Sequence, residues 1–362
     1  VSLFVYETTR ISKLKKFTTV YGNTDYKSKF NVKYQNIDLK KNIFSSQTKN
    51  YVLKFIRLEK RNFSSIIEVH NRPSYIHILN KNLKNRLFTL FFHNDPLTMD
   101  GSKNVEQRKI LLKICYRIIF NSSWSKKRFL EGLESKFINS NKLLIFYQSA
   151  KKGKLSFVNN KKKWITFVGK LNRAKGYDIF AKAIKNILNK YPDWKALIIG
   201  DEKREKILLN HKNATVMGFK KHTEVLNIFK KTSITIACSR WEEPFGRTSL
   251  EASANGCAVI ITDKGGLPET VTDAKIISEL NTKNLINTIK LLIDKPKLRK
   301  KLQNLSIKNF YLTHEFVSRK IDAYRSEKLN FNKTIFTKTK EKKLRILHVT
   351  NFNERLDGRL FF

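Results

Sequence analysis

Residues 239–269 read S-R-W-E-E-P-F-G-R-T-S-L-E-A-S-A-N-G-C-A-V-I-I-T-D-K-G-G-L-P-E, and the rest of the chain is best interpreted around this stretch. Two carboxylates, Glu243 and Glu251, are separated by the loop sequence Pro-Phe-Gly and the start of a helical pattern. A short apolar run and a Gly-Gly turn follow. The pattern predicts a loop with free backbone N–H groups that leads into a helix carrying an acid. Such a helix start binds phosphate and a nearby carboxylate binds hydroxyls, so the stretch suits a phosphorylated sugar.

Short apolar runs alternate with amphipathic segments on both sides of this stretch. The alternation of strand and helix with short connections indicates a parallel sheet covered by helices on both faces. The expected strands are residues 164–168, 196–199, 214–217, 233–237 and 274–277. The expected helices are residues 177–191, 223–230, 283–293, 297–311 and 316–329.

The first half of the chain repeats the alternation, which predicts a second α/β sheet. The expected strands are residues 17–21, 65–69, 87–92, 117–121 and 142–147. The expected helices are residues 1–12, 50–59, 74–79, 103–115 and 126–134. A Ser in the run Ser123-Trp124-Ser125 is expected to cap the last of these helices. The composition shifts to Lys, Asn, Gly and Ser near residues 151–163, which predicts a domain boundary. Two doubly wound domains with a cleft between them are therefore expected, at residues 1–155 and 156–312.

The two ends of the chain raise a separate question. A helix leads the chain, although a strand and a tight loop would normally precede it in an α/β sheet, so the first strand looks absent and residues before Val1 are expected. Residues 313–330 are interpreted as a helix that packs back toward the first domain, and residues 331–362 as a linker and a strand. The run L-R-I-L-H-V-T at 344–350 is typical of a buried first strand. Either a further domain begins there, or this strand fills the position that the amino end lacks.

Two predicted strands of the first domain end in a histidine that is followed by Asn and then by Pro. These are His70 and His93, in the runs H-N-R-P and H-N-D-P. The carboxyl ends of parallel strands are where open α/β sheets bind ligands, which makes both histidines site candidates. His93 is the first choice, and His70 is the second and could instead be structural. Asp95 either acts with His93 or forms the turn before Pro96. His211, His222 and His314 are interpreted as structural.

The charge of the chain is extreme, with 73 Lys and Arg against 30 Asp and Glu and a formal net charge of +43. Such a surface attracts polyanions, and an anionic membrane surface is the functional partner that we retain for it. The basic residues are spread along the whole chain and form no single stripe, so no specific nucleic-acid partner is expected. The alternative is a Lys-rich, solvated surface that follows from an A/T-rich coding sequence. No apolar run approaches the ~20 residues that cross a bilayer.

The chain has three cysteines, Cys115, Cys238 and Cys257, each in an apolar segment. Their odd number and wide separation indicate reduced core residues of a cytoplasmic protein, and their spacing indicates no metal site.

Together these motifs resemble glycosyltransferase family 4, the retaining enzymes of GT-B fold that use nucleotide sugars. The acidic stretch is similar to the family's E-x7-E block, and Gly265, Gly266 and Glu269 fit the turn that follows it. The run F-V-G-K at 167–170 and the run R-A-K-G at 173–176 resemble its F-V-G-R-x-x-x-x-K-G loop. Residues 309–325 resemble its terminal helices. The resemblance covers almost all of the second half of the chain and the first half only loosely.

The resemblance implies a role for each candidate residue. Glu251 would bind the ribose hydroxyls of the nucleotide, and Glu243 would lie beside the transferred sugar. Lys170 and Lys175 would offset the negative charge on the departing pyrophosphate, without a metal or another cofactor. Lys170 stands where the family commonly has Arg, so it keeps the charge and loses the bidentate fork. His93 would lie near the reacting carbon of the sugar. The remaining donor-binding candidates are Gly169, Phe245, Gly246, Arg247 and Thr248.

The resemblance thus implies a metal-independent, retaining transfer of a hexose from a nucleoside diphosphate sugar to a hydroxyl of a saccharide or glycolipid acceptor. The acceptor is expected in a lipid-linked or envelope saccharide, reached in the cytoplasm at the inner face of the membrane. For the two acids alone, a hydrolase pair is the alternative. For the whole chain, the alternatives are a basic protein that binds nucleic acid or anionic membranes, and a truncated, non-catalytic GT-B homologue, because nothing before Val1 supplies the family's first strand and Gly-rich loop.

Overall fold

The computed structural model describes residues 1–24, 30–38, 47–335 and 343–351. The chain forms two compact units. One consists of Val1–Gln148 together with the segment that begins at His314, and the other consists of Ser149–Thr313. The sequence predicted domain boundaries at 155/156 and 312/313, whereas the two units meet along the chain at 148/149 and 313/314. Both units are built from helices and parallel strands, which confirms the predicted α/β class.

The second unit contains a six-stranded sheet in which every pair of neighbouring strands is parallel. Its strands lie in the order β12-β11-β10-β7-β8-β9. Numbered along the chain, this is the doubly wound order 3-2-1-4-5-6 read from the opposite edge, and the order reverses at β7 and β10. The strands are β7 (Lys162–Val168), β8 (Lys195–Ile199), β9 (Ala214–Val216), β10 (Thr232–Ala237), β11 (Ala258–Thr262) and β12 (Ala274–Ile277).

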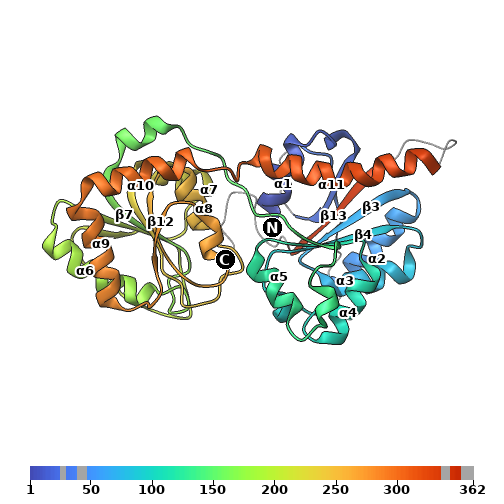
Figure 1. Ribbon diagram of the computed structural model, residues 1–362, viewed down its shortest axis with the longest axis horizontal. Helices are drawn as coiled ribbons and strands as arrows, with labels where there is room; N and C mark the ends of the chain where they lie inside the picture. Colours follow the sequence, from blue (N-terminus) through green and yellow to red (C-terminus); the bar gives the residue numbers. More distant parts are fainter. Residues whose placement is uncertain (25–29, 39–46, 336–342, 352–362) are drawn as a thin grey trace. The chain divides into compact units, whose positions relative to one another are not determined.

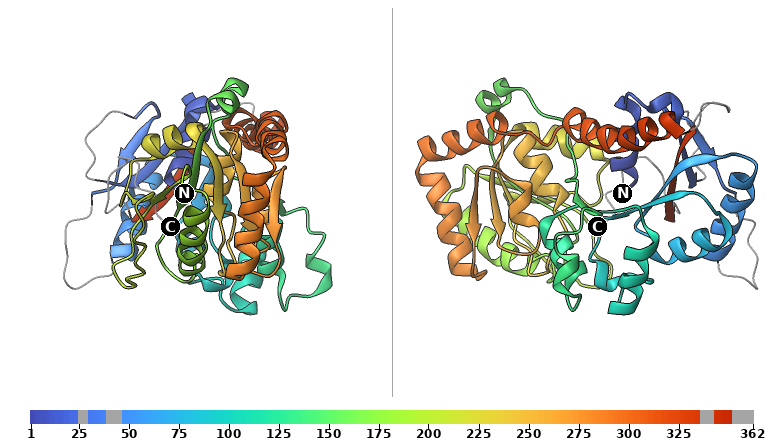
Figure 2. Two further views of the ribbon diagram at one scale, coloured as in Figure 1. Left: turned by 90° about the vertical axis from the view of Figure 1, so that its left-hand side faces the viewer. Right: turned by 45° about the vertical axis from the view of Figure 1, so that its right-hand side comes forward.

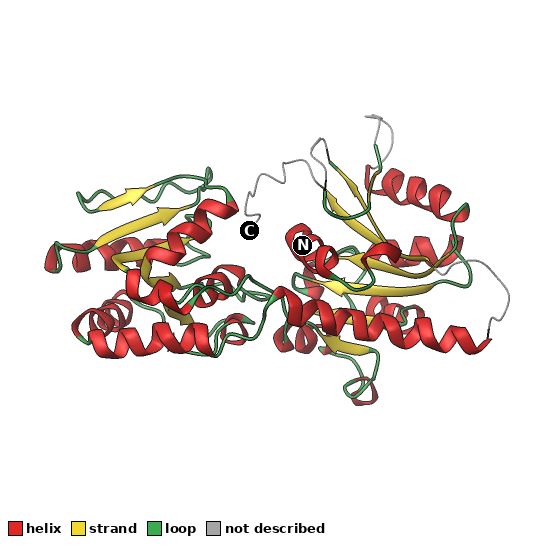
Figure 3. Ribbon diagram, turned by 90° about the horizontal axis from the view of Figure 1, so that it is seen from above, coloured by secondary structure: helices red, strands yellow, loops and turns green. Residues whose placement is uncertain are grey.

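Helices cover both faces of this sheet. Figure 3 shows the strands, in yellow, between the helices, in red. Alternate residues of β11 enter two different apolar clusters, because successive side chains of a strand point to opposite faces. Ile260 packs with residues of α6 and α9, whereas Val259 packs with residues of α7 and α8. The helices are α6 (Tyr177–Lys190), α7 (His222–Lys231), α8 (Arg247–Ala254), α9 (Thr282–Asp294) and α10 (Pro296–Lys308).

The first unit contains a seven-stranded parallel sheet in the order β2-β1-β13-β3-β4-β5-β6. The strand expected at 344–350 is β13, and it lies between β1 and β3, with Ile346 in register with Val20 on one side and with Glu68 on the other. This is the central place that the first strand holds in a doubly wound sheet. The strands are β1 (Thr18–Asn23), β2 (Tyr34–Asn36), β3 (Ser64–His70), β4 (Leu87–Phe92), β5 (Arg117–Phe120), β6 (Leu143–Ile145) and β13 (Lys343–Asn351).

The two faces of the first sheet are covered by different parts of the chain. One face packs on the helices between the strands, and the other packs on α1 and α11, which lie side by side although they are far apart in sequence (Figures 1 and 2). Phe91 of β4 belongs to the second face together with Phe4, Val317 and Ile321. The helices are α1 (Ser2–Ile11), α2 (Gln47–Lys60), α3 (Pro73–Asn82), α4 (Val105–Ile114), α5 (Ser123–Leu130) and α11 (His314–Ile335).

Three local predictions were wrong. Helix α5 starts at Ser123, three residues before the predicted start, because the Ser122 hydroxyl accepts a hydrogen bond from the Ser125 backbone N–H at 3.0 Å and so caps the helix. Helix α11 continues to Ile335, into the predicted linker, since residues 330–335 contain no Pro or Gly that would end it. The short strand β2 was not predicted. Residues 336–342 of the predicted linker lie outside the described residues.

The three cysteines are buried and free, as predicted for core thiols. Within the described residues, no helix is both long enough and apolar enough to cross a membrane.

Candidate functional site

The predicted carboxylate and lysine of the second unit meet at the carboxyl ends of two neighbouring strands. Glu243 lies in the loop after β10, and Lys175 lies in the loop after β7. The Lys175 ammonium nitrogen is 2.5 Å from Oε1 of Glu243, and the Ser239 hydroxyl donates a hydrogen bond to the same oxygen at 2.8 Å. Both side chains of the ion pair remain partly accessible, at 22% for Lys175 and 11% for Glu243. A ligand at this edge of the sheet can therefore reach both charges.

The two loops are fastened to each other through their backbones. The carbonyl oxygen of Ala174 accepts hydrogen bonds from the backbone N–H groups of Arg240 and Trp241, at 2.9 and 3.1 Å. Gly176 permits this close approach, because a Cβ atom there would lie 1.9 Å from the carbonyl oxygen of Cys238, and its φ of +70° is left-handed. The Lys-Gly pair of the motif thus has a physical reason: the glycine lets the loop lie against the end of β10 and carries the lysine to Glu243.

Glu251 lies on α8 and is 1% exposed. Its Oε1 atom is 2.8 Å from Nε2 of His222, at the start of α7, and 2.6 Å from Nε of Arg247, one turn earlier on α8. Burial alone would raise the pKa of this carboxyl group, but the charges and hydrogen bonds of Arg247 and His222 lower its pKa below the usual value. Glu251 is therefore held as a carboxylate inside the unit.

The first turn of α8 provides the second expected feature, a helix start with available N–H groups. Gly246 precedes the helix with a left-handed φ of +105°, and within the described residues no side chain caps this helix. Thr248 is buried in the first turn, and the Phe245 ring is buried. An uncapped helix start attracts anions, because its N–H groups and the helix dipole both favour negative charge there.

The two remaining candidates of the second unit, Gly169 and Lys170, lie in the loop that follows β7. The Gly169 N–H donates a hydrogen bond to the Ile199 carbonyl at 3.0 Å, so this amide already has a partner inside the unit. Lys170 follows β7 and is half-buried, and within the described residues its ammonium group makes no ion pair or hydrogen bond. The structure brings Lys175 to Glu243 and does not bring Lys170 into contact with either acid.

The two histidine candidates of the first unit, which follow neighbouring strands, meet in the structure. Nδ1 of His70 is 3.0 Å from Nε2 of His93, and the two rings are nearly parallel. Asn71 fixes the start of the loop that follows β4, because its side-chain oxygen accepts a hydrogen bond from the His93 backbone N–H at 2.9 Å. His93 is 6% exposed and His70 is 2% exposed, so both rings are largely inside the unit.

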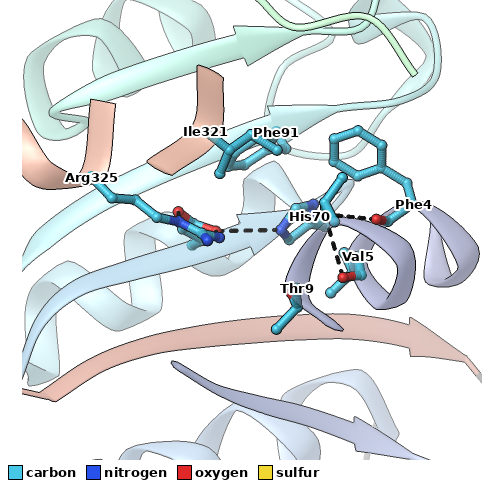
Figure 4. A pocket seen from close by; sticks show the side chains of 9 residues that line it. Phe4, Val5, Thr9, His70, Phe91, Ile321 and Arg325 are labelled. Carbon is cyan, nitrogen blue, oxygen red and sulfur yellow. Dashed lines mark hydrogen bonds and ion pairs between the residues drawn. The ribbon is translucent and has the colours of Figure 1, made fainter. Parts of the chain in front are cut away.

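A small pocket on the α1 and α11 face reaches His70 (Figure 4). Nε2 of His70 is 4.0 Å from Oε2 of Glu68, a buried carboxylate that pairs with Arg325 of α11. The Arg325 Nε and terminal nitrogen donate to the two oxygens of Glu68 at 2.8 and 2.6 Å. A chain of buried polar groups thus links the returning helix to the two histidines.

Asp95 does not join His93. Its carboxylate accepts a hydrogen bond from the Leu97 N–H at 3.0 Å, which caps the short 3-10 helix Pro96–Thr98, and it pairs with Arg128 at 3.1 Å. These contacts belong to the turn-forming role that the sequence left open for Asp95.

Sequence reasoning missed His222, because nothing near it indicates that its partner lies 29 residues further along the chain. The available signal was its place at the start of a helix that follows a strand end, where α/β sheets bind ligands. His211 and His314 also have partners: His211 contacts the Asn189 side-chain oxygen, and His314 lies 3.6 Å from Glu7.

The family model described as "Glycosyl transferases group 1" matches residues 149–308, which almost coincide with the second unit. The chain is 24% identical to the spore coat protein SA of Bacillus subtilis over 244 residues, which are 60% of this chain and 64% of that protein. It is 30% identical to the lipopolysaccharide core biosynthesis mannosyltransferase LpsB of Rhizobium meliloti over 121 residues, 31% of this chain and 34% of LpsB. The match thus spans less than two thirds of the length of either relative.

Solved structures resemble both units of the chain. The crystal structure of Anabaena HepE in complex with UDP and glucose has a TM-score of 0.69 and 15% identity, and the match covers 90% of this chain and 95% of HepE. The sucrose-phosphate synthase of Thermosynechococcus elongatus has a TM-score of 0.66 and 13% identity, with coverage of 86% and 89%. At these identities the likeness establishes the fold, which is the GT-B fold that the sequence predicted.

Proposed function

We propose that the protein is a retaining glycosyltransferase, because residues 149–308 match the model of the group 1 glycosyl transferases and the chain has the GT-B fold. It transfers a hexose from a nucleoside diphosphate sugar to an acceptor hydroxyl. The observation that carries the proposal is the meeting of Lys175, Glu243 and the start of α8 at one edge of the parallel sheet.

The donor binds along this edge. The start of α8 and the Lys175 ammonium group supply positive charge for the two phosphates, and the Glu251 carboxylate accepts hydrogen bonds from the ribose hydroxyls. Glu243 accepts hydrogen bonds from hydroxyls of the hexose. HepE, which has the same fold, is described with UDP and with UDP-glucose bound, which supports a donor of this class.

The chemical step breaks the bond between the anomeric carbon and the oxygen of the β-phosphate. The electron pair leaves with the nucleoside diphosphate, the acceptor oxygen bonds to the anomeric carbon on the same face, and the acceptor proton is released. Negative charge therefore grows on the diphosphate, and in this proposal the Lys175 ammonium group stabilises it, together with Lys170 from the same loop. We propose that these lysines do so without a metal ion.

The acceptor is a saccharide of a lipid-linked or envelope polymer. Spore coat and lipopolysaccharide core proteins are among the relatives, which supports an acceptor at the cell surface or its precursor. The net charge of +43 favours binding at an anionic membrane surface, where a lipid-linked acceptor is available to a cytoplasmic protein.

The test is the release of nucleoside diphosphate from UDP-, GDP- and ADP-hexoses in the presence of membrane extract. We expect release from one of these donors, and a fall in kcat of about 10² to 10³ for Lys175→Met, the usual loss when one donor to a developing oxyanion is removed. Lys163→Met is the matched control, because Lys163 is an exposed lysine of the same unit whose ion pair is with Asp193. If the unaltered protein releases no nucleoside diphosphate from any donor, the proposal is wrong.

A further inference from the structure

His222 is a residue of the nucleotide site that neither the motif nor the family match indicates. Its Nε2 atom lies 2.8 Å from Oε1 of Glu251, the carboxylate proposed to bind ribose. The acceptor is a carboxylate, so the imidazole N–H donates. The contact is largely protected from water, because the side chains of Glu251 and His222 are 2% and 17% exposed.

A rigid part of the fold holds the histidine in this place. His222 is the first residue of α7, and α7 is anchored by Val225 and Phe229, which are completely buried beneath it. The Glu224 carboxylate accepts a hydrogen bond from the Lys221 N–H at 2.9 Å and so secures the start of the helix. Helix α7 also packs against α8, which carries Glu251. The distance from His222 to Glu251 is therefore set by the packing of two helices.

The two partners of Glu251 converge on one of its oxygens. His222 and Arg247 both contact Oε1, and within the described residues no hydrogen bond reaches Oε2. Arg247 is on the same helix and constrains the side chain from one direction only. His222 approaches from a different helix, and the two donors together fix the orientation of the carboxylate plane. Oε2 then keeps its lone pairs for a ligand.

We propose that His222 is a positioning residue that orients Glu251 toward the ribose hydroxyls, an inference that rests on the proposed donor site. It determines how strongly the site distinguishes a ribonucleotide from its 2′-deoxy counterpart. Without the His222 donor, the carboxylate turns toward Arg247 and its second oxygen loses the orientation that the hydroxyl requires.

Calorimetric titration tests this role of His222. The probes are a nucleoside diphosphate, whichever of UDP, GDP and ADP binds the unaltered protein most tightly, and the 2′-deoxy form of the same nucleotide. We expect the unaltered protein to prefer the ribonucleotide by about tenfold or more, the usual loss when a charged acceptor is left without its partner hydroxyl. In His222→Leu, ribonucleotide affinity falls by a similar factor, 2′-deoxynucleotide affinity changes little, and the preference approaches one. His222→Gln retains the preference, because its amide N–H can reach the same oxygen.

His211→Leu is the matched control, since His211 lies in the same unit and contacts Asn189 instead of an acid. Circular dichroism verifies that each variant is folded. If His222→Leu does not fold, His222→Gln is compared with His222→Asn instead, because the Asn side chain is too short for its amide to reach Glu251. A preference that survives in His222→Leu, or in His222→Asn, overturns the inference and leaves the proposed function intact. If the unaltered protein binds none of the nucleotides, the proposed donor site and this inference both fail.

Discussion

The buried ion pair between Glu68 and Arg325 offers a sharp test of how the first unit is held together. Glu68 is in the middle of β3 and Arg325 is on α11, and their side chains are 0% and 4% exposed. The Tyr324 hydroxyl also donates a hydrogen bond to Glu68. Burial alone would lower the pKa of the Arg325 guanidinium, but the Glu68 carboxylate more than reverses this effect and raises it. The pair is therefore charged, and each partner depends on the other.

The change Glu68→Gln keeps the size of the side chain and removes its charge. The remaining acid near Arg325 is Asp322, whose Oδ1 is 3.7 Å away and already accepts a hydrogen bond from the Ser12 hydroxyl. It cannot replace two charge-assisted hydrogen bonds, so the buried guanidinium loses its closest counter-charge and both of these hydrogen bonds. Breaking a buried pair in this way costs about 3–5 kcal/mol, and we expect the first unit to lose that much stability.

The assay must report on the first unit alone, because the two units need not unfold together. Hydrogen exchange of peptides from β3 and from the amino-terminal half of α11 does so. A loss of about 3–5 kcal/mol speeds exchange through global opening by roughly 10² to several thousand. Glu106→Gln is the control, since Glu106 forms an exposed pair with Lys109 and should cost less than about 0.5 kcal/mol.

A second variant separates the missing charge from the altered shape. Glu68→Gln combined with Arg325→Met removes both charges, and we expect it to cost clearly less than the sum of the two single changes, because no unpaired ion remains. Additive costs would refute the reasoning, and so would a cost below about 1 kcal/mol for Glu68→Gln alone.

Two further predictions concern the second unit. Lys161→Met removes a half-buried ammonium group that donates to the carbonyls of Phe229 and Asn255, at the carboxyl ends of α7 and α8, at 2.8 and 2.7 Å. Urea denaturation should show a loss of about 1.5–3 kcal/mol in the free energy of unfolding, and an unchanged midpoint would contradict this. The pKa of the Glu251 carboxyl group is below its ordinary value of 4.5, so its contribution to stability is present above about pH 4.5 and is lost as the pH falls through the folded-state pKa. Between pH 6 and pH 3.5, the free energy of unfolding measured by denaturation should therefore fall more for the unaltered protein than for Glu251→Gln. An equal fall for the two proteins would contradict the assignment.

Among the described residues, the sequence was sufficient for every strand except β2 and for the motif residues that lie close to the strands. Parallel strands are buried on both faces, so they are visible as apolar runs, and the strand predicted at 87–92 is the observed β4. The ends of neighbouring parallel strands lie at one edge of the sheet, which explains why His70 and His93, two candidates chosen for their places after strands, lie close together. The meeting of Lys175 with Glu243 follows in the same way, because β7 and β10 are neighbours.

The same reasoning fails where a position depends on packing between distant segments. Edge strand β2 has three half-buried residues and therefore no apolar run. His222 reaches Glu251 only because α7 and α8 pack on the same face of the sheet, and helix periodicity states which side of a helix is buried but not which helix it meets.

Glu68 shows where a further signal was available. The run S-S-I-I-E-V-H is a buried strand with one acid inside it, and an acid that is fully buried needs a counter-charge. The sequence therefore required a basic partner, but offered 73 lysines and arginines from which to choose it. Arg325 is the partner because α11 returns to the first sheet and packs beside α1, which brings the Arg325 guanidinium to Glu68 of β3. A buried charge in a strand thus predicts that an ion pair exists, and only the packing of the returning helix decides with which residue.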